Sequence, residues 1–159
     1  MVVISDTSVI TYLFQLDCIT LLKDLFQETI IPQAVKEELE KISSQRDILN
    51  QYDWIKVKAI ENLVLFDSLS NQLDRGEAEA ITLSLELNAD ILLIDEKRGR
   101  KIATEYGIKI TGLIGVLIDG KQMGLIENVK PLLDRLIYEI GFRISPKLYD
   151  YVLSVIKED

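Results

Sequence analysis

The sequence predicts an α/β fold built on a parallel sheet. Short apolar runs at residues 2–5 and 91–95 are rich in Val, Ile and Leu, which is typical of strands buried on both faces. Such runs alternate along the chain with longer helical patterns, the order expected of a parallel sheet covered by helices. The chain has 159 residues, enough for one domain with a substantial core. We therefore expect a single domain over 1–159.

The elements can be assigned in order along the chain. The expected sequence is strand 2–5, helices over about 8–26, strand 29–31, a helix from 33 into the forties, strand 54–60, helix through the sixties, helix 75–88, strand 91–95, helix 97–106, strand 108–111, and two or three helical pieces after that.

Local residues support these boundaries. Pro32 suits the first turn of the helix after strand 29–31, and Asp74 suits the N-cap of helix 75–88. Gly107 follows helix 97–106, where a helix-ending residue is expected. Ser145 and Pro146 form a cap-and-start pair for the last helix. We expect the helical tail to be interrupted at glycines 124 and 141.

The composition excludes several kinds of chemistry. The chain has no histidine, which removes Ser-His-Asp and Cys-His catalysis and most zinc sites. Its net charge of −8 argues weakly against broad nucleic-acid binding, although clustered acids around bound cations would weaken that argument. No secretion signal or membrane-spanning run is visible, and Cys18 sits among apolar residues as in a reducing compartment. We expect a cytoplasmic protein with no membrane association.

Two carboxylates follow predicted strands directly. Asp6 comes after Val2–Ser5, and Asp95 comes after Ile91–Ile94. Ligands of parallel sheets bind in the crevice beyond the carboxyl ends of the strands. Either residue could instead act as the N-cap of the next helix.

Two glutamates face the apolar side of predicted helices. Each helical residue advances about 100°, which puts Glu38 at the edge of its helix's apolar stripe. Glu77 falls in the middle of its stripe, whereas Glu79 and Glu86 fall on the polar face. A favourable helix dipole explains Glu77 equally well, and a salt bridge explains Glu38. The conjunction with Asp6 and Asp95 favours one crevice with four carboxylates, whose oxygens select Mg²⁺ or Mn²⁺.

This arrangement resembles the PIN domain, a family of metal-dependent nucleases. Val-Ile-Ser-Asp-Thr-Ser, ending at Ser8, looks like the first family motif, and Ile31–Leu39 looks like the second, with Glu38 as its acid. Gly76–Ile81 and Ala89–Asp95 look like the third and fourth. Family members commonly place the third acid eighteen residues before the fourth, which selects Glu77 over Glu79. Many members carry Asp there, so Glu77 is a longer-armed variant.

The resemblance implies a three-layer α/β/α sandwich with a central, mainly parallel sheet of about five strands, and residues 113–159 as a helical C-terminal extension packed on it. It also implies a ribonuclease that cuts single-stranded RNA with Mg²⁺ or Mn²⁺. Many bacterial and archaeal relatives are toxins paired with a small antitoxin, and many form homodimers.

The resemblance also assigns roles to residues. Asp6, Glu38 and Asp95 would hold a first metal, and Glu77 would complete a second site or orient the attacking water. Thr7 and Ser8 would fix the side chain of Asp6, or cap the helix that begins beside them. The basic run Lys97–Lys101 would grip RNA phosphates, or form an ordinary solvated helix face.

Two alternatives remain at this point. The first is a catalytically weak or inactive PIN-like module that binds nucleic acid or protein, against which the four filled acidic positions argue. The second is another acid-rich α/β class with an aspartyl phosphate on Asp6. A haloacid-dehalogenase-like phosphatase needs a second Asp two residues on, where this chain has Ser8, and the order of strands does not suit a receiver domain.

Overall fold

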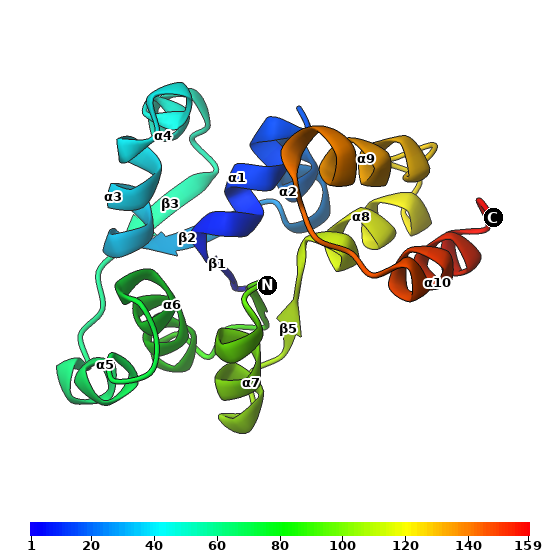
Figure 1. Ribbon diagram of the computed structural model, residues 1–159. Helices are drawn as coiled ribbons and strands as arrows, with labels where there is room; N and C mark the ends of the chain where they lie inside the picture. The colour runs from blue at the N-terminus through cyan, green and yellow to red at the C-terminus, as the bar shows by residue number, and fades with distance from the viewer.

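A central sheet of five parallel strands organises the molecule (Figure 1). The computed structural model describes residues 1–159. The strand order is β3-β2-β1-β4-β5, and helices cover both faces of the sheet. This confirms the predicted α/β/α sandwich. The strands are β1 (Val3–Ser5), β2 (Thr29–Pro32), β3 (Ile55–Lys58), β4 (Ile91–Leu93) and β5 (Ile110–Thr111).

Ten α-helices connect and follow the strands. They are α1 (Thr7–Gln15), α2 (Thr20–Phe26), α3 (Gln33–Lys41), α4 (Ile48–Gln51), α5 (Leu63–Leu69), α6 (Arg75–Glu86), α7 (Lys97–Glu105), α8 (Leu113–Gln122), α9 (Lys130–Arg135) and α10 (Pro146–Ile156). A 3₁₀ turn covers Ser43–Gln45, and a π-helical turn covers Leu136–Ile140. No helix has both the length and the apolar character that crossing a membrane requires.

The predicted boundaries are mostly accurate. Asp74 and Ser145 accept N-capping hydrogen bonds at the starts of α6 and α10, as expected. Gly124 and Gly141 interrupt the tail with positive φ angles of 76° and 89°, which glycine adopts without strain. Pro32 is the last residue of β2 and precedes α3.

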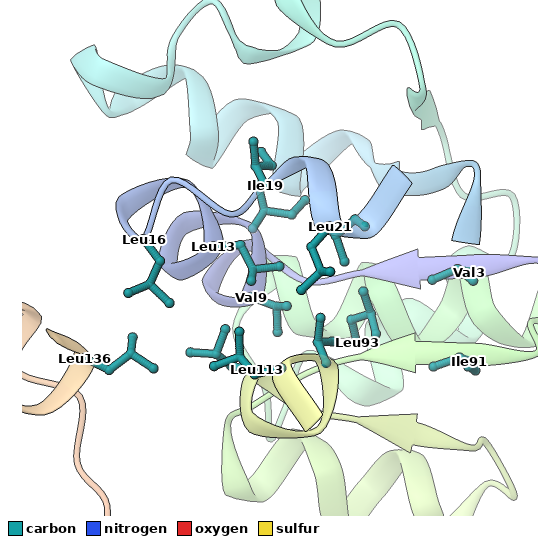
Figure 2. Packing of buried hydrophobic residues seen from close by; sticks show 14 of the residues in the cluster. Val3, Val9, Leu13, Leu16, Ile19, Leu21, Ile91, Leu93, Leu113 and Leu136 are labelled. Carbon is teal, nitrogen blue, oxygen red and sulfur yellow. The ribbon is translucent and has the colours of Figure 1, made fainter. Parts of the chain in front are cut away.

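Alternate side chains along the strands pack into two separate hydrophobic cores, one on each face of the sheet. Val3 and Leu93 belong to a cluster of 25 buried residues with helices α1, α2, α3, α8, α9 and α10 (Figure 2). Ile4, Leu92 and Ile94 belong to a cluster of 12 with α5, α6 and α7. This period of two explains why both strands read as unbroken apolar runs, because each face of the sheet is buried.

The segment after β5 is built into the larger core. Leu113, Leu136 and Val152 are buried in the same cluster as Leu13 of α1. Figure 2 shows Leu136 on the side of Leu16 and Leu113, and Figure 1 shows α9 beside α1 and α2. Within the tail, the Tyr149 hydroxyl of α10 donates to Asp134 Oδ1 of α9 at 2.6 Å. The tail therefore packs against the first helices of the chain.

Candidate active site

Asp6 lies at the carboxyl end of the central strand. Its backbone N–H donates to the Leu93 carbonyl of the adjacent β4 at 2.9 Å, which fixes the residue at the strand ends. The side chain is only 6% exposed and makes no capping hydrogen bond to α1. Burial raises the pKa of Asp6 to about 7, although a hydrogen bond from the Thr7 backbone lowers it. The negative charges of Asp74, Glu38 and Asp95 raise the pKa further. Asp6 therefore occupies the N-cap position of α1 without serving as the usual capping acceptor.

Glu38 approaches Asp6 from α3. The Thr7 hydroxyl donates to Glu38 Oε2, across 31 residues of sequence, and not to Asp6 as the sequence suggested. Gly76 at the start of α6 makes room for both acids. A methyl group added there would lie 2.5 Å from Glu38 Oε1 and 3.4 Å from Asp6 Oδ1. The two carboxylates therefore meet over a position where a side chain would displace one of them.

Glu77 forms a reciprocal capping box with Asp74. Its backbone N–H donates to Asp74 Oδ1 at 2.9 Å, and the Asp74 N–H donates to Glu77 Oε1 at 3.4 Å. The other oxygen, Oε2, is buried without a hydrogen-bond partner. Burial and the neighbouring Asp74, with Asp6 contributing, raise the pKa of Glu77 to about 8. Glu77 thus caps its helix and also presents one unsatisfied carboxylate oxygen.

Asp6, Glu38 and Glu77 line one cavity of about 540 Å³. They come from the end of β1, from α3 and from α6, so the fold brings together acids that lie far apart in sequence. Asp74 and Glu96 line the same cavity, and sequence reasoning gave neither of them this position. The D-x-x-E pattern of a capping box was the available signal for the pairing of Asp74 with Glu77.

Asp95 faces a different cavity, although its strand end is adjacent to that of Asp6. Its Oδ1 accepts a hydrogen bond from the Leu113 backbone N–H at 2.9 Å, and Oδ2 is buried without a partner. The cavity that it lines, of about 500 Å³, also contains Arg100 and Arg143. Burial raises the pKa of Asp95, while the Leu113 N–H and Arg100 oppose the rise. The structure therefore gathers three of the four predicted acids in one cavity and leaves Asp95 outside it.

The chain matches one known family over nearly its whole length. A family model described as a PIN domain matches residues 2–158. The chain belongs to the PIN-domain family. Among curated proteins, none matches the chain significantly. PIN domains are generally nucleases that act on RNA with divalent metals, and this PIN domain has their nuclease-type fold. Three of its predicted acids lie in one cavity.

The carboxylate oxygens of this PIN domain show whether it suits a divalent cation. The donors are carboxylate oxygens, which suit Mg²⁺ or Mn²⁺, and Glu77 Oε2 and Asp95 Oδ2 are buried acceptors without a donor. However, no three acidic side chains surround a common point closely enough to hold an ion. The donor chemistry fits a divalent cation, and side-chain rotation is needed to complete its coordination.

Glu79 corrects the helical-wheel prediction. It was expected on the polar face of α6, yet it is only 5% exposed. Its Oε1 accepts from the Ala34 backbone N–H of α3 at 3.1 Å, and its Oε2 accepts from Arg75 Nε at 3.1 Å. A helical wheel assumes one buried stripe, whereas α6 of this PIN domain contacts the sheet, α3 and α5.

The basic run lies on α7, beside the acidic cavity. Arg100 Nη1 donates to the Ile94 carbonyl at 2.8 Å, and Arg98 Nη1 donates to the Gln72 carbonyl at 3.2 Å. Lys97 and Lys101 are exposed and make no ion pair. Two of the four cations thus have structural partners in this PIN domain, and a phosphate-binding role for the run stays a prediction.

Proposed function

We propose that this PIN domain is an endoribonuclease that hydrolyses phosphodiester bonds in single-stranded RNA with Mg²⁺ or Mn²⁺. One observation carries the proposal. Asp6 and Glu38, from elements distant in sequence, meet over the side-chain-free position of Gly76 and share a cavity with Glu77. Buried carboxylates are strongly unfavourable without a partner. A divalent cation is the partner that would offset their mutual repulsion.

We infer that Asp6 and Glu38 are the main ligands of that cation. Asp95, at the neighbouring strand end, and Glu77, through its unpaired Oε2, would complete the acidic set after side-chain rotation. When bound, the cation supplies an activated water and neutralises charge on the phosphate. Thr7 would hold the Glu38 carboxylate by its hydroxyl hydrogen bond. The absence of side-chain bulk at Gly76 would let the two acids remain close.

The decisive experiment is cleavage of a fluorescent single-stranded RNA with Mn²⁺ or Mg²⁺. We expect Asp6→Asn and Glu38→Gln each to lower cleavage more than about 100-fold, beyond the 10–100-fold typical of lost supporting residues. Glu40→Gln is the matched control, because Glu40 lies on the same helix and pairs near the surface with Lys36 at 3.6 Å. Circular dichroism should show unchanged folding. Normal cutting by both variants would contradict the proposal.

A second candidate function has specific support. Glu77 is engaged with Asp74, Asp95 faces another cavity, and no three acids surround a common point. These features favour a PIN-like module that binds nucleic acid or protein without cutting. The two candidates separate in one assay. RNA binding without cleavage in Mg²⁺ or Mn²⁺, unaffected by Asp6→Asn, would support the binding module.

The biological setting is a further proposal, which rests only on what the family resemblance implies. We propose that the protein is the toxin of a toxin–antitoxin pair, with a small antitoxin partner, and that it forms a homodimer. Growth arrest on expression in bacteria, relieved by Asp6→Asn and by a small protein encoded beside it, would support the first part. Light scattering of the purified protein tests the second, and a monomeric mass at micromolar concentration would contradict it.

A further inference from the structure

The acidic cavity continues into a neutral half along α1. Beyond the carboxylates it is lined by Ser8, Thr11, Tyr12 and Gln15, which lie on one face of the helix because they recur at helical spacing. Ile140, from the π-helical turn of the tail, lines the same half. No lysine or arginine lines this cavity. Its neutral half therefore has no cation to hold a phosphate.

Tyr12 is positioned by the tail. Its ring makes an edge-to-face contact with the ring of Phe142, with ring centroids 5.1 Å apart and an interplanar angle of 85°. Such contacts favour a defined relative orientation of the two rings. Tyr12 is half-buried, and Figure 1 shows the segment after α9 passing beside α1. The C-terminal segment thus completes the wall of the cavity and orients an aromatic ring there.

Some polar side chains of this face make hydrogen bonds within the protein, and others make none. The Thr11 hydroxyl donates to Gln45 Oε1 at 3.0 Å, which anchors Thr11 to the 3₁₀ turn. The Ser8 hydroxyl, the Tyr12 hydroxyl and the Gln15 side-chain amide make no hydrogen bond within the protein. Proteins recognise unpaired bases by stacking them on aromatic rings and by hydrogen bonds to the base edges, and this face offers both kinds of group.

We propose that this face of α1, closed by Ile140, is a nucleobase subsite that stacks an unpaired RNA base on Tyr12. It rests on the proposed nuclease function, since the base belongs to the nucleotide beside the scissile phosphate. Thr7 and Tyr12 lie about 7–8 Å apart along the helix axis. That separation places the base next to the acids that would act on its phosphate. Ser8 and Gln15 supply the hydrogen bonds to the edge of the base.

The first test uses nucleosides, which carry no phosphate and so report on the subsite without cleavage or metal. Adenosine, guanosine, cytidine and uridine at millimolar concentration are titrated into the isotope-labelled protein in EDTA. We expect amide and side-chain NMR shifts at Tyr12, Gln15 and Ile140, with one base favoured. Shifts absent from these three residues for all four nucleosides would overturn the subsite.

The second test measures cleavage of RNAs that differ only in the bases flanking the cut. Tyr12→Ala should raise KM about 5- to 100-fold, as expected for a lost base stack, with a smaller change in kcat and a flatter base preference. Tyr12→Phe should retain the preference because the ring remains. The control is Tyr106→Ala, since Tyr106 is 46% exposed at the end of α7 and away from the cavity. An unchanged KM and preference in Tyr12→Ala would overturn the proposal.

The two proposals fail separately. Nucleoside shifts at Tyr12 without any RNA cleavage would support the subsite and contradict the nuclease. Metal-dependent cleavage abolished by Asp6→Asn, but without nucleoside shifts or any effect of Tyr12→Ala, would support the nuclease and contradict the subsite. Since Tyr12→Ala also removes the contact with Phe142, its thermal unfolding is measured beside that of Tyr12→Phe.

Discussion

The Glu79 carboxylate in α6 accepts a hydrogen bond from the backbone N–H of Ala34, 3.1 Å away in the first turn of α3. The residue at the N-cap of α3 is Pro32, whose side chain cannot accept a hydrogen bond. Glu79 therefore does from another helix what an N-cap side chain usually does locally. Its second oxygen binds Arg75, which pairs in turn with Glu37 of α3. This bridge joins the helices that carry Glu38 and Glu77.

We predict that Glu79→Ala destabilises the protein by about 1–3 kcal/mol, because it leaves the buried Ala34 N–H without an acceptor. Glu79→Gln should be milder, since its amide oxygen can still accept from Ala34. Urea unfolding followed by circular dichroism measures both. If the two variants unfolded at the wild-type urea midpoint, the bridge would have no role in stability.

The second prediction concerns Gly76. Gly76→Ala would place a methyl group 2.5 Å from Glu38 Oε1 and 3.4 Å from Asp6 Oδ1, so at least one carboxylate must move. Alanine is the better helix former by about 1 kcal/mol, which offsets part of the strain. We expect metal-dependent cleavage to fall at least about 10-fold while the protein remains folded. RNA cleavage and thermal unfolding are the measurements, and cleavage at the wild-type rate would contradict the prediction.

Local patterns in the sequence were sufficient for much of the fold and for part of the site. Apolar runs that end in an acid located Asp6 and Asp95, because strand ends in a parallel sheet share one edge. The inward position of Glu38 could be predicted from the pattern of its own helix. The hydrogen-bond partner of Thr7 could not be predicted, because the bond from Thr7 to Glu38 spans 31 residues and depends on how α1 and α3 pack.

The sequence did not predict side-chain orientations that depend on contacts with several neighbouring elements. Glu79 belongs to a helix covered on more than one side, which a wheel with one apolar stripe cannot represent. Asp95 turns toward α8 because the Leu113 N–H at the start of that helix binds its Oδ1. Glu96, the residue after Asp95, lines the cavity with Asp6. These orientations depend on backbone groups of elements that come later in the chain. A local stretch of sequence gives no information about those contacts.

The third prediction is that the metal-free protein loses stability as the pH rises. Burial holds the pKa of Asp6 at about 7 and that of Glu77 at about 8, above the ordinary values of about 4 in an unfolded chain. A raised carboxyl pKa means that the folded state binds the proton more tightly. The stability that these protons provide is complete below pH 4 and is lost as the pH rises through 7 to 8. We expect Tm in EDTA to fall between pH 5 and 8.5.

Two comparisons isolate the cause of that pH dependence. Asp6→Asn removes one titrating group and should flatten the decline in Tm. Mn²⁺ or Mg²⁺ should raise Tm more at pH 8 than at pH 5.5, because cations bind the deprotonated carboxylates. A pH dependence identical in Asp6→Asn and wild type would show that Asp6 titrates normally.

The last prediction decides which acid after β4 serves the site. Family spacing assigns the fourth position to Asp95, whereas Glu96 is the neighbour that lines the cavity with Asp6. Asp95 has a buried, unpaired Oδ2, and its charge contributes to the raised pKa of Asp6, so the two groups already interact. Glu96 instead accepts from the Gly99 backbone N–H at 3.0 Å as the N-cap of α7. We therefore expect Asp95→Asn to lower RNA cleavage more than about 10-fold. Glu96→Gln should change cleavage less than twofold, because glutamine can still cap the helix. The opposite ranking, with both variants folded by circular dichroism, would move the fourth position of the site to Glu96.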